Sequence, residues 1–168
     1  MNRNYEIKCR MNRFTGIRKI LSSRKDYIRT AENQRDIYYK VKRGRLKLRI
    51  INEKSCCLIY YRRNEKSGKR VSNYILSYSD NFRELDFILR QEFKILVTVV
   101  KKREIYIKNN IRIHLDTVKK LGKFLEVEII YGDFNIAKDQ MKEIISCLNL
   151  EETEFIKPSY SDLLINKK

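Results

Sequence analysis

The stretch "IRIHLDTVKKLGKFLEVEI" (residues 111–129) alternates polar and aliphatic residues in two runs, one on each side of a turn-like LGKF. Successive side chains of a β-strand point to opposite faces of the sheet, so each run predicts a strand with one polar and one apolar face. The polar faces of this pair carry Arg112, His114, Asp116, Glu126 and Glu128.

The same period of two recurs through most of the chain. It predicts strands at 4–10, 36–41, 43–51, 57–63, 72–78, 95–107, 110–116 and 123–130. Apolar residues at helical spacing predict helices at 14–23, 79–93 and 133–150. With one proline and five glycines, no linker-like run divides the chain, so we expect one domain over 1–168. This inventory predicts an α+β fold built on a closed, eight-stranded antiparallel β-barrel with flanking helices.

The direction of the polar faces decides what such a barrel can do. In an ordinary β-sandwich the charged rows face water, and this is the simpler interpretation of any single strand. The rows together mix acids and bases, as in Glu-x-Lys-x-Arg at 6–10 and Arg-x-His-x-Asp at 112–116, which solubility alone does not require. We therefore expect a polar lumen, with the apolar rows outside beneath the helices. Because buried unpaired charges cost several kcal/mol each, we expect a polyanion and a metal ion to occupy it.

The overall charge agrees with an anionic ligand. Thirty-eight Lys and Arg against 21 Asp and Glu give a net charge of +17, which attracts nucleic acid, anionic membranes or phosphorylated small molecules. The single histidine excludes multi-histidine zinc sites and argues against a Ser-His-Asp triad. Four cysteines without CxxC spacing indicate free thiols, and the N-terminus lacks an apolar signal segment. We expect a cytoplasmic protein with no membrane association.

Several motifs resemble the CYTH superfamily of triphosphate tunnel metalloenzymes, most closely its branch of class IV adenylyl cyclases. They are YEIKCR near the start, GRLKLR at 44–49, VVKKREIY at 99–106, the stretch at 111–129 and SYSDLL at 159–164. These motifs span almost the whole chain in the family's order. The resemblance implies an eight-stranded tunnel that binds a triphosphate with a divalent metal.

The resemblance also implies roles for individual residues. The triphosphate-binding positions would be Lys8, Arg10, Lys47, Arg49, Arg62, Lys101, Arg103 and Arg112. The metal ligands would be Glu6, Asp116, Glu126 and Glu128, and the catalytic residues Glu6 and Glu128. In this alignment Glu6 matches the first acid of the family's E-x-E-x-K motif, Lys8 replaces the second acid and Arg10 replaces the lysine. Such a change would remove one metal ligand and puts catalytic competence in question.

The expected activity is hydrolysis of a triphosphate (inorganic tripolyphosphate, a nucleoside triphosphate or thiamine triphosphate) with Mg²⁺ or Mn²⁺. One alternative is a class IV adenylyl cyclase that makes cyclic AMP from ATP. Another is a non-catalytic tunnel that captures nucleotides or polyphosphate. A basic barrel that binds nucleic acid is disfavoured, because the interleaved carboxylates would repel a phosphate backbone. The expected partner is thus a small molecule that carries a triphosphate, bound by a monomer or homodimer.

Overall fold

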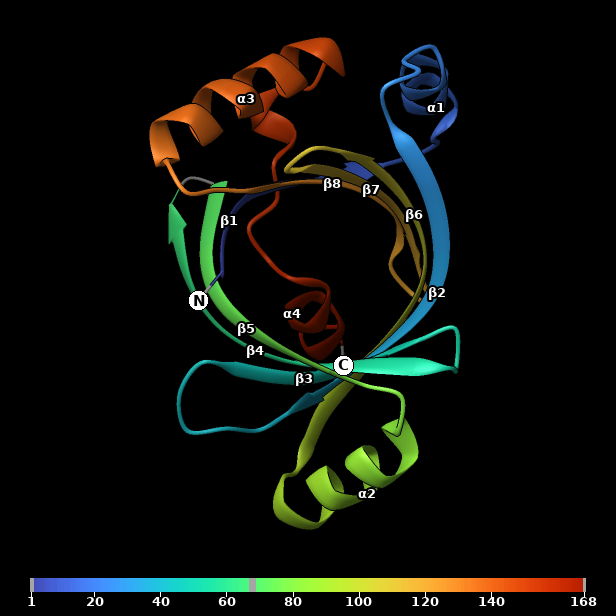
Figure 1. The fold of residues 1–168 in the computed structure, drawn as a ribbon, viewed down its shortest axis with the longest axis vertical. Helices are drawn as coiled ribbons and strands as arrows, with labels where there is room; N and C mark the ends of the chain where they lie inside the picture. The colour runs from blue at the N-terminus through green and yellow to red at the C-terminus, as the bar shows by residue number, and fades with distance from the viewer. Residues whose placement is uncertain (1, 67–68, 168) are drawn as a thin grey trace.

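Eight antiparallel strands close into a barrel in the computed structural model, which describes residues 2–66 and 69–167 (Figure 1). The strands are β1 (Asn2–Met11), β2 (Ile28–Tyr39), β3 (Arg45–Ile51), β4 (Ser55–Lys66), β5 (Lys69–Ser79), β6 (Ile95–Lys108), β7 (Ile111–Val118) and β8 (Gly122–Ile130). Around the barrel they follow the order β1-β5-β4-β3-β2-β6-β7-β8, and β8 pairs with β1. The predicted barrel is therefore confirmed.

The helices are α1 (Thr15–Ser22), α2 (Phe82–Glu92), α3 (Phe134–Cys147) and α4 (Tyr160–Ile165), with a 3-10 turn, η1, at Glu152–Glu154. Figure 1 shows α1 and α3 outside the barrel on one side and α2 outside on the opposite side. Within the described residues, no helix combines the length and the apolar character needed to cross a membrane.

The apolar rows of the strands face outward, where these helices cover them. Ile7 of β1, Leu115 of β7 and Val127 of β8 are buried in one cluster with Leu21 of α1 and Met141 of α3. A second cluster packs α2 against β2 and β3. Burial of one such aliphatic side chain contributes about 1.5–3 kcal/mol, so helix cover holds the apolar faces outward. The polar rows consequently face the lumen, as predicted.

The C-terminal segment closes one end of the barrel, and α4 is seen inside the ring of strands in Figure 1. The ring of Tyr160 packs edge-to-face on that of Phe124, with centroids 4.9 Å apart. Arg45 of β3 forms an ion pair with Asp162 of α4, with 3.0 Å between nitrogen and oxygen. These contacts attach α4 to the strands that surround it.

β2 is longer than the alternation predicted, because it starts at residue 28 and not at 36. Its first part, 28–35, is polar on both faces. Glu32 and Gln34 line the lumen, whereas Arg29 and Arg35 form ion pairs with acids of the outer face. A strand that is polar on both faces shows no hydrophobic period, so the pattern missed it.

The turn between β2 and β3 depends on Gly44. Gly44 has φ +69°, and a Cβ there would lie 2.8 Å from the hydroxyl oxygen of Tyr60. A side chain at this position would therefore be both strained and in collision with Tyr60.

Candidate functional site

The lumen holds a cavity of about 500 Å³, to which every strand of the barrel contributes side chains. This volume falls in the range of about 300–1,000 Å³ that small-molecule sites occupy. Ser159 and Tyr160 line it at the end that α4 closes. Among the described residues, the wall carries the cations Lys8, Lys47, Arg49, Lys101, Arg103 and Arg112, the acids Glu6, Glu32, Glu126 and Glu128, and the imidazole of His114.

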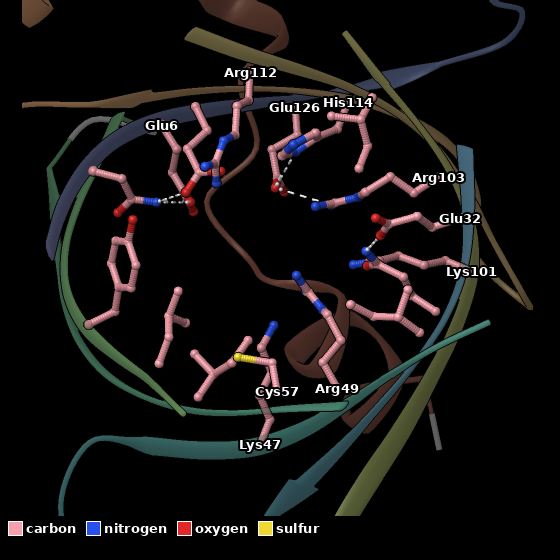
Figure 2. A pocket seen from close by; sticks show the side chains of 18 of the residues that line it. Glu6, Glu32, Lys47, Arg49, Cys57, Lys101, Arg103, Arg112, His114 and Glu126 are labelled. Atoms are coloured by element: carbon pink, nitrogen blue, oxygen red, sulfur yellow. Dashed lines mark hydrogen bonds and ion pairs between the residues drawn. The ribbon is translucent and has the colours of Figure 1, made fainter. Parts of the chain in front are cut away.

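Most of the predicted site residues meet in this wall, and Figure 2 shows many of them converging on the lumen from different strands. They are Glu6, Lys8, Lys47, Arg49, Lys101, Arg103, Arg112, Glu126 and Glu128. Three of the predicted residues, Arg10, Arg62 and Asp116, are not part of it.

The N-terminal motif lies on β1, and only part of it reaches the cavity. Asn4, Glu6 and Lys8 line the cavity, whereas Arg10 is exposed and donates to the carbonyl oxygen of Leu121 at 2.8 Å. The three lining residues of β1, Asn4, Glu6 and Lys8, thus have the same spacing as the three named positions of the E-x-E-x-K motif. Arg10, which the resemblance placed among the triphosphate-binding residues, lies outside the cavity wall.

Arg62 lies on the outer face of β4, so its predicted place in the lumen was also wrong. The lining residues of β4 are Cys57, Ile59 and Tyr61, and Arg62 has the opposite parity. Its side chain is exposed, and its Nε donates to the hydroxyl of Tyr60 at 3.3 Å. Both faces of this strand carry tyrosine and aliphatic residues, so polarity alone did not show which face is inward.

Arg103 is the centre of a buried ionic network. Its Nε and Nη2 donate to Asp116 at 2.7 and 2.6 Å, and Nη2 also reaches Glu126 at 3.2 Å. The hydroxyl of Tyr160 donates to Asp116 at 2.8 Å, and Lys8 pairs with Glu126 at 3.0 Å. Although burial raises carboxyl pKa values, these cations hold the pKa of Asp116 at about 2 and that of Glu126 well below its usual value. Fully buried Asp116 is thus occupied behind the wall, and its predicted role as a metal ligand is not supported.

His114 faces the lumen beside this network. Its Nδ1 lies 3.4 Å from Oε1 of Glu126. Burial, and next the charge of Arg103, lower the pKa of His114, so its ring is neutral at pH 7. A neutral imidazole contributes a hydrogen bond to the wall and no further cation.

Asp36 of β2 forms ion pairs with three cations on the adjoining strands β3 and β6. It lies 2.9 Å from Lys47, 2.7 Å from Arg49 and 3.6 Å from Lys101. Burial raises the pKa of Asp36, but the three cations outweigh it and hold the pKa well below its usual value. One carboxylate thus faces three basic side chains, and the surplus positive charge is directed at the lumen. Sequence reasoning missed Asp36 although it lies within the predicted strand 36–41, because its three cationic partners lie on neighbouring strands.

Lys101 is expected to take up a proton when a triphosphate binds. Burial, and next the charge of Arg103, lower the pKa of Lys101 to about 7, so most of it is neutral at pH 8. A polyanion beside the amine favours the charged form and raises its pKa. Titration calorimetry at pH 8 in buffers of different ionisation enthalpy should show uptake of nearly one proton per triphosphate. Lys101→Met should abolish most of this uptake, and equal uptake in that variant would contradict the assignment.

Glu6 and Glu128 form an acidic pair on the neighbouring strands β1 and β8, where they lie directly opposite each other. Asn4 donates its Nδ2 to Glu128 at 2.6 Å and to Glu6 at 3.3 Å. Arg112 lies opposite Glu128 on the other side, and Figure 2 shows it over the lumen near Glu6. No cluster of three or more His, Cys, Asp or Glu suited to a metal occurs within residues 2–66 and 69–167.

The acidic pair still fits a metal ion that arrives with its ligand. Mg²⁺ is commonly held by one or two carboxylates together with substrate phosphates, and it prefers hard oxygen donors. Glu6 and Glu128 supply two carboxylates, and the buried Oδ1 of Asn4 supplies an amide oxygen that has no hydrogen-bond partner. Glu126, by contrast, is engaged by Lys8 and Arg103.

Three buried side-chain atoms in the described part of the chain lack a hydrogen-bond partner, and all three belong to residues of the cavity wall. They are Oδ1 of Asn4, Oε1 of Gln34 and Oγ of Ser72. Buried polar groups are nearly always paired, so these three atoms are exceptions, and all of them belong to the cavity wall. Sequence reasoning identified none of them, because neutral polar residues carry no pattern that separates a lumen from an outer surface.

The chain is similar to known proteins in sequence and in structure. The family model described as the CYTH domain matches residues 2–160. A provisionally named adenylate cyclase, MJ0240 of Methanocaldococcus jannaschii, is 31% identical over 122 residues, which cover 69% of each chain. The PH1012 protein of Pyrococcus horikoshii OT3 has a similar structure, with a TM-score of 0.84 at 24% identity over 97% of this chain and 99% of that one. The structure of a provisionally named adenylate cyclase of Vibrio parahaemolyticus has a TM-score of 0.77 at 16% identity, over 96% of this chain and 97% of that one. Both structural similarities concern the fold alone.

Proposed function

The chain belongs to the CYTH domain family, and from this premise we propose that its lumen binds a triphosphate with Mg²⁺ or Mn²⁺ and hydrolyses it. The observation that carries the proposal is the composition of the cavity wall. Six Lys and Arg side chains, an acidic pair and three residues with an unpartnered polar atom line one cavity. Such a wall complements a polyphosphate that carries a cation.

The basic side chains would bind and orient the phosphates. Arg49 and Arg112 offer planar groups of donors that suit phosphate oxygens, whereas Lys8, Lys47 and Lys101 act as point charges. Hydrolysis forms a bond from a water oxygen to phosphorus and breaks the bond to a bridging oxygen, which leaves with negative charge. Cations fixed before the reaction stabilise that charge without reorganisation, and no nucleophilic side chain is needed.

The acidic pair would hold the metal ion. Glu6 and Glu128 would be its protein ligands, and the amide of Asn4 would turn its Oδ1 towards it. When bound, a divalent ion supplies Lewis acidity to the phosphoryl oxygens and lowers the pKa of an attacking water.

An adenylyl cyclase is the second candidate, and the name of the M. jannaschii relative favours it. The same cations would then orient ATP so that its own 3′-hydroxyl attacks the α-phosphorus, with pyrophosphate as the leaving group. Hydrolysis requires only a water molecule in line with the bond that breaks, which is the less demanding geometry.

Purified protein should release phosphate from at least one of tripolyphosphate, ATP and thiamine triphosphate when Mg²⁺ or Mn²⁺ is present. Phosphate and cyclic AMP are measured separately, because cyclic AMP with pyrophosphate would establish the cyclase instead. Loss of product on addition of EDTA is the metal control. A folded protein that turns over none of the three contradicts both enzymatic proposals, and tight binding without product would support a capture tunnel. Steeply salt-dependent binding of long nucleic acid that ignores triphosphate would support the nucleic-acid alternative.

A further inference from the structure

The C-terminal segment, residues 155–165, passes beside β1 before α4 closes the barrel (Figure 1). Phe155 forms an isolated antiparallel bridge with Cys9, and the backbone N–H of Ile156 donates to the carbonyl oxygen of Lys8 at 2.8 Å. Further along, the segment contributes Tyr160, a buried residue that lines the lumen. The C-terminal segment thus contacts the backbone of one lumen cation and adds a side chain to the wall.

The ring of Tyr160 lies close to two lumen cations. The ammonium nitrogen of Lys8 lies 4.0 Å from the centroid of the ring, and that of Lys101 lies 5.3 Å from it. Lys8 belongs to β1 and Lys101 to β6, two strands that do not pair with each other in the barrel. Both lysine side chains are buried, with 3% and 2% of their surface exposed. A ring attracts a cation most strongly where water is excluded, so both contacts are of the strong kind.

Other contacts fix the position of this ring. The hydroxyl of Tyr160 donates to Asp116 at 2.8 Å, and the ring packs edge-to-face on that of Phe124. The preceding residue, Ser159, accepts a hydrogen bond from Arg45 of β3 at 2.8 Å. Burial, and next the charge of Asp116, raise the pKa of Tyr160 well above its usual value, so the hydroxyl keeps its proton and remains a donor. The ring is therefore a fixed point against which flexible side chains can be held.

Lysine side chains at a phosphate site need such a point. A lysine carries its charge on a flexible four-carbon stem, so the position of the ammonium group depends on what surrounds it. Lys8 also pairs with Glu126 at 3.0 Å, and Lys101 lies 3.6 Å from Asp36. A carboxylate that holds an ammonium group also cancels its charge. The ring has no net charge, so it holds the two amines without reducing the positive potential that attracts phosphates.

We propose that Tyr160 is a positioning residue of the triphosphate site, and that its ring holds the ammonium groups of Lys8 and Lys101 where the phosphates bind. The C-terminal segment then takes part in ligand binding as well as in closing the barrel. This inference rests on the proposed function, because it concerns the cations that would bind the phosphates. A role in closing the barrel alone predicts a different result, in which changes at Tyr160 lower stability and leave the affinity of the folded protein unchanged.

The test is titration calorimetry in Mg²⁺ with the tripolyphosphate analogue in which methylene groups replace the bridging oxygens, so that no hydrolysis occurs. Tyr160→Leu keeps an apolar side chain and removes the ring, and it should weaken binding about tenfold. Tyr160→Phe keeps the ring and loses the hydrogen bond to Asp116, and it should bind within about twofold of the native chain. The pair of variants separates the ring from the hydroxyl.

Phe124→Leu is the matched control, because it makes the same ring-to-leucine change at the same end of the barrel. Phe124 is fully buried and is not part of the cavity wall. This variant should melt at a lower temperature, as expected for a cavity in the core, and keep its affinity within about twofold. Circular dichroism shows that each variant is folded at the temperature of the titration.

A double-mutant cycle tests whether the ring acts through the lysines. In a Lys8→Met background, Tyr160→Leu should weaken binding only about threefold, because one of the two cations that the ring holds is gone. Native affinity of folded Tyr160→Leu, an equal loss in Tyr160→Phe or Phe124→Leu, or an undiminished effect in the Lys8→Met background overturns the inference and leaves the proposed function standing. Failure of the folded native chain to bind the analogue overturns both.

Discussion

Replacement of Arg103 by methionine should lower the free energy of unfolding by about 3–5 kcal/mol, the usual cost of removing one partner from a buried ion pair. The side chain is 5% exposed, and its two main bonds go to Asp116, which is fully buried. Without the guanidinium, Asp116 and Glu126 would face each other as buried carboxylates. Denaturant unfolding followed by circular dichroism measures the loss.

Two further variants separate this charge effect from the loss of side-chain packing. Arg35→Met is the matched control, because Arg35 pairs with exposed Glu53 on the outer face, and it should cost less than about 1 kcal/mol. The double variant Arg103→Met with Asp116→Asn should recover part of the stability, since the amide oxygen still accepts from Tyr160. An Arg103→Met variant as stable as Arg35→Met would contradict the proposed importance of the network.

The same network makes the stability of the protein depend on pH, and the pKa of Asp116 gives the direction of this dependence. The pKa of Asp116 lies at about 2 in the folded protein, below its ordinary value of 3.8. Its ion pair therefore contributes stability above pH 4, and this contribution is lost as the pH falls from about 4 to 2. The double variant lacks this ion pair and should lose less stability over that interval.

The hairpin at 111–129 shows why much of the fold could be predicted. Over 111–116 and 125–129 its two strands separate polar from aliphatic residues, so alternation identifies the strands, and the mixed charges indicate a lumen. β4 shows where this reasoning fails. Tyrosines occur on both of its faces, so the inward parity, and with it the exclusion of Arg62, depended on pairing with its neighbours.

Two other features were beyond the reach of local pattern. The hydroxyl of Tyr160 donates to Asp116, which is 44 residues away in the sequence, and no sequence periodicity predicts that contact. Alternation places Asn4, Glu6, Lys8 and Arg10 on one face of β1, so it could not show which of them line the cavity. The structure places Asn4 in the cavity wall, opposite Ser72 and beside the acidic pair, and Arg10 outside it.

Glu128→Gln should reduce turnover by at least about 100-fold while the melting temperature stays the same or rises. The change keeps the shape of the side chain and removes one charge from the acidic pair. Charge stabilisation by a bound metal supplies several kcal/mol, and about 3 kcal/mol corresponds to roughly 100-fold in rate. Stability should not suffer, because Glu6 and Glu128 are like charges placed opposite each other. The measurements are kcat/KM on the substrate that the assay identifies and the thermal unfolding midpoint.

Glu143→Gln is the matched control, because it makes the same chemical change at an exposed position of α3. It should leave both turnover and melting temperature unchanged. A metal role also predicts that Glu128→Gln weakens the binding of Mn²⁺ in the presence of triphosphate, while triphosphate alone binds at least as well to the less acidic lumen. If the Glu128→Gln variant instead unfolds at a much lower temperature, Glu128 stabilises the barrel through the hydrogen bond that it accepts from Asn4. The metal would then need other ligands.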